Sequence, residues 1–282
     1  MDINLIRTFI EITKTGSFIS AAERLHVTQT TVTARIHTLE DQLKCRLFIR
    51  NRSGANLTEN GKHFISHATQ LIQVWEAARR DLPLPEGNKV SISIGGELSL
   101  WNPLMLAWLN RLREIQSEVA IHVEIGESHT LHQKLESGLI DIILVHRPEY
   151  WSGMQVEQIL EEKLVMVRCP SKPEPYVYID WGKEFRQQHD AALPHLAKTN
   201  LVINFGPLAL FYLQNNGGSG YFRTRVIQAP LKEGTLELVP QAPEFSYPVY
   251  LIYPRDKHNL ATSSALAILK DTISDEISWS QY

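Results

Sequence analysis

The sequence predicts a helical N-terminal part joined to an α/β C-terminal part: a winged helix-turn-helix, a long linker helix and then a domain of two α/β subdomains. Three observations carry this prediction. Two amphipathic helical patterns with a very short turn between them precede a basic hairpin, the next segment repeats apolar residues in heptads, and strand and helix patterns alternate after residue 89. With 282 residues and 43% hydrophobic content, the chain can form two or more packed domains.

Composition excludes several classes of protein. No apolar run approaches the roughly 18 to 20 residues of a membrane span, and the first residues lack the basic segment of a secretory signal, so a cytoplasmic location is expected. The two cysteines, Cys45 and Cys169, are too few for a disulfide framework and have no partners at metal-ligand spacing. Both are expected to be buried thiols, and no metal or other cofactor is indicated.

Charge is distributed unevenly along the chain. The net charge of −3 by itself argues against a nucleic-acid partner, but it averages over two parts of opposite charge. Residues 1–85 hold 11 Lys and Arg against 8 Asp and Glu, whereas the remainder holds 17 against 23. Between Arg24 and Lys62 there are 7 basic and 3 acidic residues. Positive charge therefore gathers in the N-terminal part, as expected for a DNA-binding module.

The first three helices are predicted from apolar spacing and cap residues. The first carries an apolar stripe and ends at Gly16, a residue typical of helix C-termini. Ser17 caps a second helix, and Thr28 caps a third after a very short turn at residues 26–27. The apolar positions of the third helix are Val32, Ile36, Leu39 and Leu43. Three helices with a tight turn between the last two are typical of a helix-turn-helix.

The third helix opens with hydroxyl and amide side chains that packing does not explain, because β-branched hydroxyl residues are poor helix formers and gain little from burial. Short donor and acceptor side chains at the N-terminal end of a groove-lying helix can hydrogen-bond base edges and phosphates. The predicted DNA-contacting residues of this helix are Thr28, Gln29, Thr30, Thr31, Thr33 and His37. The alternative is a solvated, threonine-rich helix face.

A basic hairpin follows the third helix. Arg46, Arg50 and Arg52 surround a turn at Ser53 and Gly54 between two short predicted strands. Such a wing can carry guanidinium groups along the DNA backbone or into a minor groove, where positive charge is favoured. Arg50 and Arg52 are therefore further candidates for DNA contacts, unless the hairpin is only an exposed basic turn.

A long helix is predicted to begin at Thr58, because apolar residues then alternate spacings of four and three. The stripe consists of Phe64, Ala68, Leu71, Trp75, Ala78 and Leu82. A heptad pattern over about three repeats favours pairing with a second copy of the chain over docking onto the helix's own domain. Pro83 and Pro85 end the helix. The predicted boundaries are 1–57 for the winged helix-turn-helix, 58–88 for the linker helix and hinge, and 89–282 for the C-terminal domain.

Strand and helix patterns alternate from residue 89. Alternating apolar residues at 90–94 and 119–125, followed by the continuous run IDIILV, predict the βαβαβ pattern of a parallel sheet with helices on both faces. A further α/β segment follows Leu164, with strands near LVMV, LVIN and PVYLIY, before a terminal helix. We expect two interleaved subdomains with a cleft between them: subdomain I of residues 89–163 plus 254–282, and subdomain II of residues 164–253.

These motifs resemble those of LysR-type transcriptional regulators. That family's winged helix-turn-helix and linker helix are similar to the stretch GSFISAAERLHVTQTTVTARIHTLEDQLKCRLFIR followed by LTENGKHF. Its periplasmic-binding-protein-like effector domain resembles the pattern ISIG…LHQKLESGLIDIIL. The resemblance implies a homo-oligomer, a dimer or a tetramer, that binds a double-stranded DNA operator and a small polar metabolite between the two effector subdomains.

The resemblance also implies roles for particular residues. It assigns DNA contacts to Gln29, Thr33, Arg50 and Arg52. The chain departs from the family pattern at three positions. The family usually has proline where Thr30 stands and often arginine where Ala34 stands, and Lys44 replaces a common glycine at the end of the helix.

Residues after the strands are candidates for the effector pocket, because a parallel α/β unit binds ligands beyond the carboxyl ends of its strands. Ser99 and Ser128 each lie between a strand and a helix, so we expect both to cap helices whose free amides suit an anion; a structural cap, or a helix start at Asn102, is the alternative. Glu97 favours an amino acid, an amine or a zwitterion unless Arg147 neutralises it. The candidate effector-binding residues are Glu97, Ser99, Ser128, Thr130, His146, Asn204 and Phe205.

No motif indicates catalysis. The stretch NGGSGY lacks G-x-S-x-G spacing, no P-loop or dinucleotide motif is present, and His129 and His132 lack a third metal ligand nearby. Asp180 and Glu184 are expected to be solvated charges or a helix start. The leading function is an effector-responsive DNA-binding regulator. The alternatives are a constitutive DNA-binding regulator whose C-terminal domain only oligomerises, and an enzyme domain fused to a DNA-binding module.

Overall fold

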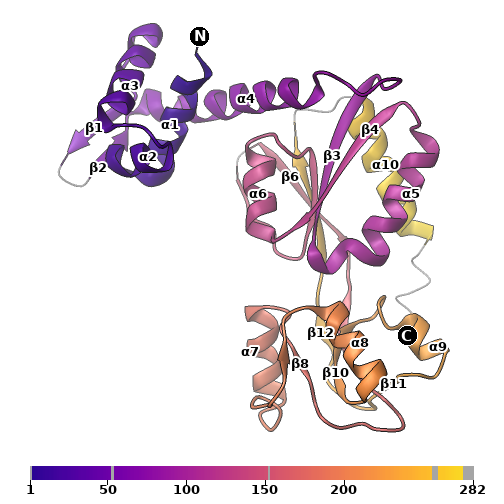
Figure 1. The fold of residues 1–282 in the computed structure, drawn as a ribbon. Helices are drawn as coiled ribbons and strands as arrows, with labels where there is room; N and C mark the ends of the chain where they lie inside the picture. The colour runs from indigo at the N-terminus through magenta and orange to yellow at the C-terminus, as the bar shows by residue number, and fades with distance from the viewer. Residues whose placement is uncertain (1, 52–53, 152, 256–259, 276–282) are drawn as a thin grey trace.

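The computed structural model of the chain describes residues 2–51, 54–151, 153–255 and 260–275. Its N-terminal part is a winged helix-turn-helix, as predicted (Figure 1). The elements are α1 (Ile3–Thr15), α2 (Phe18–Arg24), α3 (Gln29–Leu43) and the antiparallel wing strands β1 (Phe48–Asn51) and β2 (Gly54–Leu57). The predicted caps form, because the Ser17 hydroxyl accepts from the Ser20 N–H and the Thr28 hydroxyl accepts from the Thr31 N–H.

One apolar core joins these elements. Val32 and Ile36, on the inner face of α3, are buried in it together with α1 and α2. The Phe9 ring of α1 lies 5.3 Å from that of Phe48 and 5.0 Å from that of Phe64, centroid to centroid. Because Phe48 begins the wing and Phe64 belongs to the following helix, these aromatic contacts fix the wing and the linker to α1.

Helix α4 (Glu59–Asp81) is the predicted linker helix and is capped by the Thr58 hydroxyl. The first half of its heptad stripe faces its own chain: Ala68 is fully buried, and Phe64 and Leu71 pack against the winged-helix core. The expectation that the whole stripe pairs with a second copy is therefore wrong for this half. The cause is α1, which lies alongside α4 and covers these positions.

The second half of α4 is open. Val74 is 58% exposed and Trp75 is 45% exposed, and Ala78 is exposed as well. Leu82, just beyond the helix, is 70% exposed. Large apolar side chains gathered along one stretch of helix without cover are typical of an interface with another molecule.

Subdomain I is a five-stranded sheet in the order β4-β3-β5-β13-β6. The strands are β3 (Val90–Glu97), β4 (Val119–Gly126), β5 (Ile142–Val145), β6 (Met154–Leu160) and β13 (Val249–Pro254). The predicted βαβαβ unit is present, because β3 pairs in parallel with both β4 and β5. Strand β13 runs antiparallel between β5 and β6. The chain therefore returns to this sheet at Val249, not at the expected boundary of 254.

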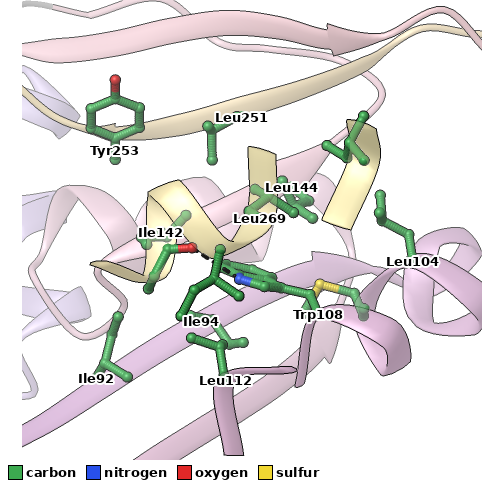
Figure 2. Packing of buried hydrophobic residues seen from close by; sticks show 14 of the residues in the cluster. Ile92, Ile94, Leu104, Trp108, Leu112, Ile142, Leu144, Leu251, Tyr253 and Leu269 are labelled. Atoms are coloured by element: carbon green, nitrogen blue, oxygen red, sulfur yellow. Dashed lines mark hydrogen bonds between the residues drawn. The ribbon is translucent and has the colours of Figure 1, made fainter. Parts of the chain in front are cut away.

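Helices cover both faces of this sheet, as predicted: α5 (Leu106–Ile115) and α10 (Leu260–Asp275) on one face, and α6 (Ser128–Glu136) on the other. Alternate residues of β5 serve the two faces, since Ile142 and Leu144 join the α5 and α10 side while Ile143 and Val145 join the α6 side. Figure 2 shows the first of these cores around Trp108, whose indole N–H donates to the Ala265 carbonyl at 3.0 Å.

Subdomain II is built on strand β7. Its sheet contains β7 (Lys163–Arg168), β10 (Ser219–Arg223), β11 (Glu237–Leu238) and β12 (Phe245–Ser246), and a separate parallel pair consists of β8 (Tyr178–Ile179) and β9 (Val202–Ile203). Its helices are α7 (Lys183–Ala192), α8 (Gly206–Asn216) and α9 (Gln228–Lys232). The segment from Gly217 to Phe222, whose role the sequence leaves open, forms the turn after α8 and then most of β10. The segment from Asp180 to Phe185 forms the turn after β8 and the first residues of α7.

Two chain crossings join the subdomains (Figure 1). The first runs from β6 into β7 and the second from β12 into β13. The crossings lie side by side, because the Tyr247 N–H donates to the Glu162 carbonyl at 2.6 Å. A pair of adjacent crossings is the arrangement that lets two subdomains close on each other as a hinge.

The N-terminal module also touches subdomain I directly. The Lys14 ammonium of α1 lies 2.9 Å from the Glu136 carboxylate at the end of α6, and the Gln73 amide of α4 donates to the Glu136 carbonyl at 3.0 Å. Gly138 sits so close that a Cβ there would lie 2.6 Å from the Gln73 Cα. Helix α6 therefore reaches from this junction at its C-terminus to the subdomain cleft at its N-terminus.

Both thiols differ from the expected burial. Cys45 and Cys169 are half-buried, because Cys45 follows the left-handed residue that ends α3 and Cys169 follows the last residue of β7. Within the described residues, no helix combines the length and apolarity needed to cross a membrane.

Candidate functional site

The outer face of α3 carries the side chains that the sequence predicts to contact DNA. Thr28, Gln29, Thr30 and His37 are exposed, and Thr31 and Thr33 are half-buried on the flanks. The hydroxyls of Thr28 and Thr31 lie 2.8 Å apart and bond each other. Thr28 therefore has a capping role, whereas Gln29 and Thr30 project into solvent at the N-terminal end of the helix. Such a position is the one a recognition helix presents to base edges.

A buried carboxylate fixes the wing to α3, and sequence reasoning missed it. Glu40 is 6% exposed and accepts from the Leu47 N–H at 2.8 Å and from the Arg46 guanidinium at 2.7 Å. Burial opposes its ionisation, but these hydrogen bonds and one from the Phe48 N–H hold the pKa of Glu40 below its usual value. An Arg46 guanidinium nitrogen also lies 3.3 Å from His37 Nδ1. Arg46 therefore connects the buried Glu40 to the exposed face of α3.

Of the two predicted wing arginines, the structure describes one. Arg50 belongs to β1, where its backbone pairs with Ala55. Arg52 lies outside the described residues. Arg35, on the edge of α3, is directed inward instead, since its guanidinium donates to the Thr8 hydroxyl at 3.4 Å.

A cavity of about 460 Å³ lies between the two effector subdomains. The predicted residues that line it are Glu97, Ser99, Ser128, His146, Asn204 and Phe205. Thr130 does not line it and is exposed, because two residues along a helix turn a side chain about 200° away from Ser128. The predicted pocket is thus brought together from both subdomains with one residue wrongly included.

The two serines do not cap helices as expected. Ser99 lies in a short 3₁₀ turn (Leu98–Leu100). A π-helical segment (Trp101–Met105), in which Asn102 before Pro103 is extended, separates this turn from α5. Ser128 is already inside α6, whose cap position is Glu127, and Glu127 makes no capping bond. Neither serine therefore marks a helix start whose free amides face the cleft.

Glu97 is held at the end of β3 by donors that follow the neighbouring strand β5 and by one on α6. It accepts from the His146 N–H at 2.9 Å and also from the Arg147 backbone and the Ser128 side chain. Burial nevertheless dominates and raises its pKa above the usual value. A positively charged group beside Glu97 would lower this pKa again.

His146 is a neutral acceptor in the cleft wall. Its ring stacks on Tyr247 at 3.8 Å, and its Nδ1 donates to the Pro248 carbonyl at 2.9 Å, which leaves Nε2 with its lone pair. Burial and the nearby Arg223 charge lower the pKa of His146 to about 3. Its Nε2 and the Ser99 hydroxyl are buried and have no hydrogen-bond partner within the described residues.

A buried ion pair spans the floor of the cleft and was not predicted. Arg223, at the end of β10, is 2% exposed and lies 3.2 Å from the carboxylate of Glu162, which is also 2% exposed. The same guanidinium donates to the Asn102 carbonyl of subdomain I at 3.2 Å. Because Glu162 lies in the first crossing, this pair ties the hinge to both subdomains.

Arg147, at the rim of the cleft, is paired across it. Its guanidinium forms an ion pair with Glu184 at the start of α7. Gly182 beside it has a φ of +101°, a backbone conformation that favours glycine, and a side chain there would displace the guanidinium. Asp180 accepts from the Gly182 N–H at 3.0 Å and pairs with Arg186. In the part of the chain that the structure describes, no three acidic, histidine or cysteine side chains cluster as a metal site would.

Comparisons with known proteins agree with this architecture. Residues 3–62 match the family described as bacterial regulatory helix-turn-helix protein, lysR family, and residues 85–274 match the LysR substrate binding domain. The HTH-type transcriptional regulator HdfR of Yersinia pestis (strain Pestoides F) is 27% identical over 237 residues, which cover 78% of this chain and 80% of that relative.

Solved structures share the whole arrangement. Full-length LysG from Corynebacterium glutamicum with bound effector Arg superposes with a TM-score of 0.61 at 15% identity, covering 98% of this chain and 99% of that one. ArgP from Mycobacterium tuberculosis superposes with a TM-score of 0.57 at 18% identity, covering 97% and 98%. At these identities the likeness concerns the fold. The two family matches together span the winged module and the effector domain, and the chain therefore belongs to the LysR family of bacterial DNA-binding transcriptional regulators.

Proposed function

We propose that the chain regulates transcription in the cytoplasm by reading an operator with the outer face of α3, and that a small polar metabolite in the subdomain cleft modulates this binding. The observation that carries the second part is the cleft itself. It is lined from both subdomains, and the Ser99 hydroxyl and His146 Nε2 in its wall are buried without a hydrogen-bond partner among the described residues. Buried polar atoms of this kind are usually satisfied by water or a ligand.

On the DNA side, Gln29 and Thr33 read base edges in the major groove, and Thr30 and His37 extend this surface. Thr28 and Thr31 keep the helix start in shape and lie next to the phosphates. Arg50 and Arg52 of the wing contact the DNA backbone or minor groove and supply affinity without sequence information.

A second copy of the chain completes the DNA-binding unit. The open half of α4, with Val74 and Trp75, offers the apolar surface for this pairing. A dimer presents two recognition helices to two half-sites, which a single winged module cannot do. Contacts between effector domains would extend this dimer to the tetramer that the family resemblance also allows.

On the effector side, Glu97, Ser99 and Ser128 of subdomain I face Asn204 and Phe205 of subdomain II across the cavity. A ligand that bridges them favours the closed arrangement of the hinge. Helix α6 begins at the cleft and ends against Lys14 and Gln73, so closure is transmitted to the DNA-binding module by a short rigid element. A ligand can shift the oligomer only by its difference in affinity for the two arrangements.

The test is an operator titration with the full-length chain. Sites would first be mapped by genome-wide recovery of bound DNA, and compounds that raise the melting temperature would be found by a metabolite screen. We expect such a compound to change operator affinity about 5- to 150-fold, a coupling of roughly 1–3 kcal/mol. A compound that binds the cleft while operator affinity stays constant would instead indicate a constitutive regulator whose C-terminal domain only oligomerises. Turnover of the compound would indicate an enzyme.

A further inference from the structure

The charges of the cleft point to the kind of ligand it accepts. The acidic residues that line it are Glu97, Glu127 and Asp180, and the basic ones are Arg147 and Arg223. Both guanidinium groups already have anionic partners from this chain, Arg223 in Glu162 and Arg147 in Glu184. Asp180 is balanced by Arg186. The charge left over in the cleft is therefore negative, at Glu97 and Glu127.

Two buried groups in the wall, His146 Nε2 and the Glu97 carboxylate, are hydrogen-bond acceptors. His146 is neutral at physiological pH, because burial keeps its pKa near 3, and its buried Nε2 can only accept a hydrogen bond. Glu97 accepts from three groups of the chain, yet its burial leaves the carboxylate short of compensating charge, as its raised pKa indicates. Glu97 and His146 thus offer acceptors to a ligand, whereas the buried Nε–H of Arg223, also without a partner among the described residues, is a donor whose charge Glu162 already balances.

Aromatic side chains line opposite walls of the same cavity. Trp101 of subdomain I is 41% exposed, and Phe211 of α8 in subdomain II is 65% exposed. Phe205 and Tyr247 also line the cavity. Aromatic faces attract a positively charged nitrogen that has left water, and the attraction adds to that of a nearby carboxylate.

We propose that the effector is an organic cation, a molecule with an ammonium, amidinium or guanidinium group directed at Glu97 and His146 and with a body packed between Trp101 and Phe211. This inference rests on the proposed function, because it names the ligand class of the same cleft. A simple carboxylate would face Glu97 and Glu127, and among the described lining residues both guanidinium groups are already in ion pairs with carboxylates. The charge balance therefore favours a cation over the anion that free helix amides would attract.

The test uses three probes of one shape and different charge: benzamidine, benzamide and benzoate. Calorimetry on the full-length chain is expected to show benzamidine binding about ten-fold or more tightly than the other two, and agmatine, a flexible cation, should bind as well. Glu127→Gln changes an exposed residue at the mouth and should weaken benzamidine without lowering the melting temperature. Glu97→Gln should remove the preference for benzamidine over benzamide. Glu174→Gln, the same change at an exposed residue outside the cleft, should leave all affinities as they were.

The outcomes separate this inference from the proposed function. Tighter binding of benzoate than of benzamidine, or no binding of either cation at millimolar concentration, would overturn the ligand class while leaving effector control intact. Binding of benzamidine that Glu97→Gln and Glu127→Gln do not weaken would also overturn it, because the cation would then sit elsewhere. Charge-selective binding in the cleft without any effect of the bound probe on operator affinity would support the inference and contradict the proposed function.

Discussion

Arg223→Met is expected to lower the free energy of unfolding of the effector domain by roughly 3–5 kcal/mol. The substitution leaves the Glu162 carboxylate buried without its partner, and it removes the hydrogen bond to the Asn102 carbonyl that ties the subdomains together. A surface arginine replaced in the same way would change stability by less than about 0.5 kcal/mol. The measurement is urea denaturation of the full-length chain, monitored with a spectroscopic probe that reports on the effector domain.

A double variant separates the ion pair from the packing. Arg223→Met combined with Glu162→Leu replaces both charges by apolar groups, which is often neutral or stabilising at buried pairs. We expect the double variant to recover most of the lost stability. If the single variant lost less than about 1 kcal/mol, the two groups would have to be hydrated in the folded protein, and the hinge would not depend on this pair.

Trp75→Asp is expected to convert the oligomer to monomers and to abolish tight operator binding. A carboxylate placed in an apolar seam costs about 3 kcal/mol or more in each chain when it has no partner. Trp75 is the suitable site because it is 45% exposed in the single chain, so its replacement leaves the winged-helix core untouched. Leu71 would be a poor choice, since it packs against that core.

Sedimentation velocity and operator titration test this second prediction. Ser66→Asp introduces the same charge at an exposed position on the opposite side of α4 and should leave both the assembly and the affinity unchanged. If the Trp75→Asp chain sediments like the wild type, the subunit interface does not include Trp75. The effector domains would then be the first alternative.

The winged module could be predicted from sequence because its signals are local. Val32, Ile36 and Leu39 repeat at helical spacing, and Ser17 and Thr28 cap the helices that they precede, as the structure confirms. The burial of Glu40 could not be predicted, because an acidic residue near the end of an amphipathic helix normally faces solvent. Only the wing, folding back, supplies the N–H groups of Leu47 and Phe48 that make its burial favourable.

The position of the cleft could be predicted from sequence, but part of its chemistry could not. Parallel strand ends meet at one edge of a sheet, which placed Glu97 and His146 together correctly. Arg223 could not be found in the same way, because the glycine-rich start of β10 weakens its strand pattern and Glu162 is distant in sequence. Val249 was assigned to the wrong subdomain since an apolar strand carries no sign of which sheet it joins.

The claim that α3 reads the operator is tested most directly by comparing Gln29→Ala with Arg50→Ala on a mapped operator and on a scrambled duplex across a range of salt concentrations. Gln29→Ala, like Thr33→Ala, should lose roughly 1–3 kcal/mol on the operator and little on the scrambled duplex, because only base contacts are removed. Arg50→Ala, like Arg52→Ala, should weaken both duplexes alike and reduce the slope of log K against log salt by about one. A Gln29→Ala chain that binds the operator with unchanged affinity and unchanged selectivity would contradict this placement of the recognition face.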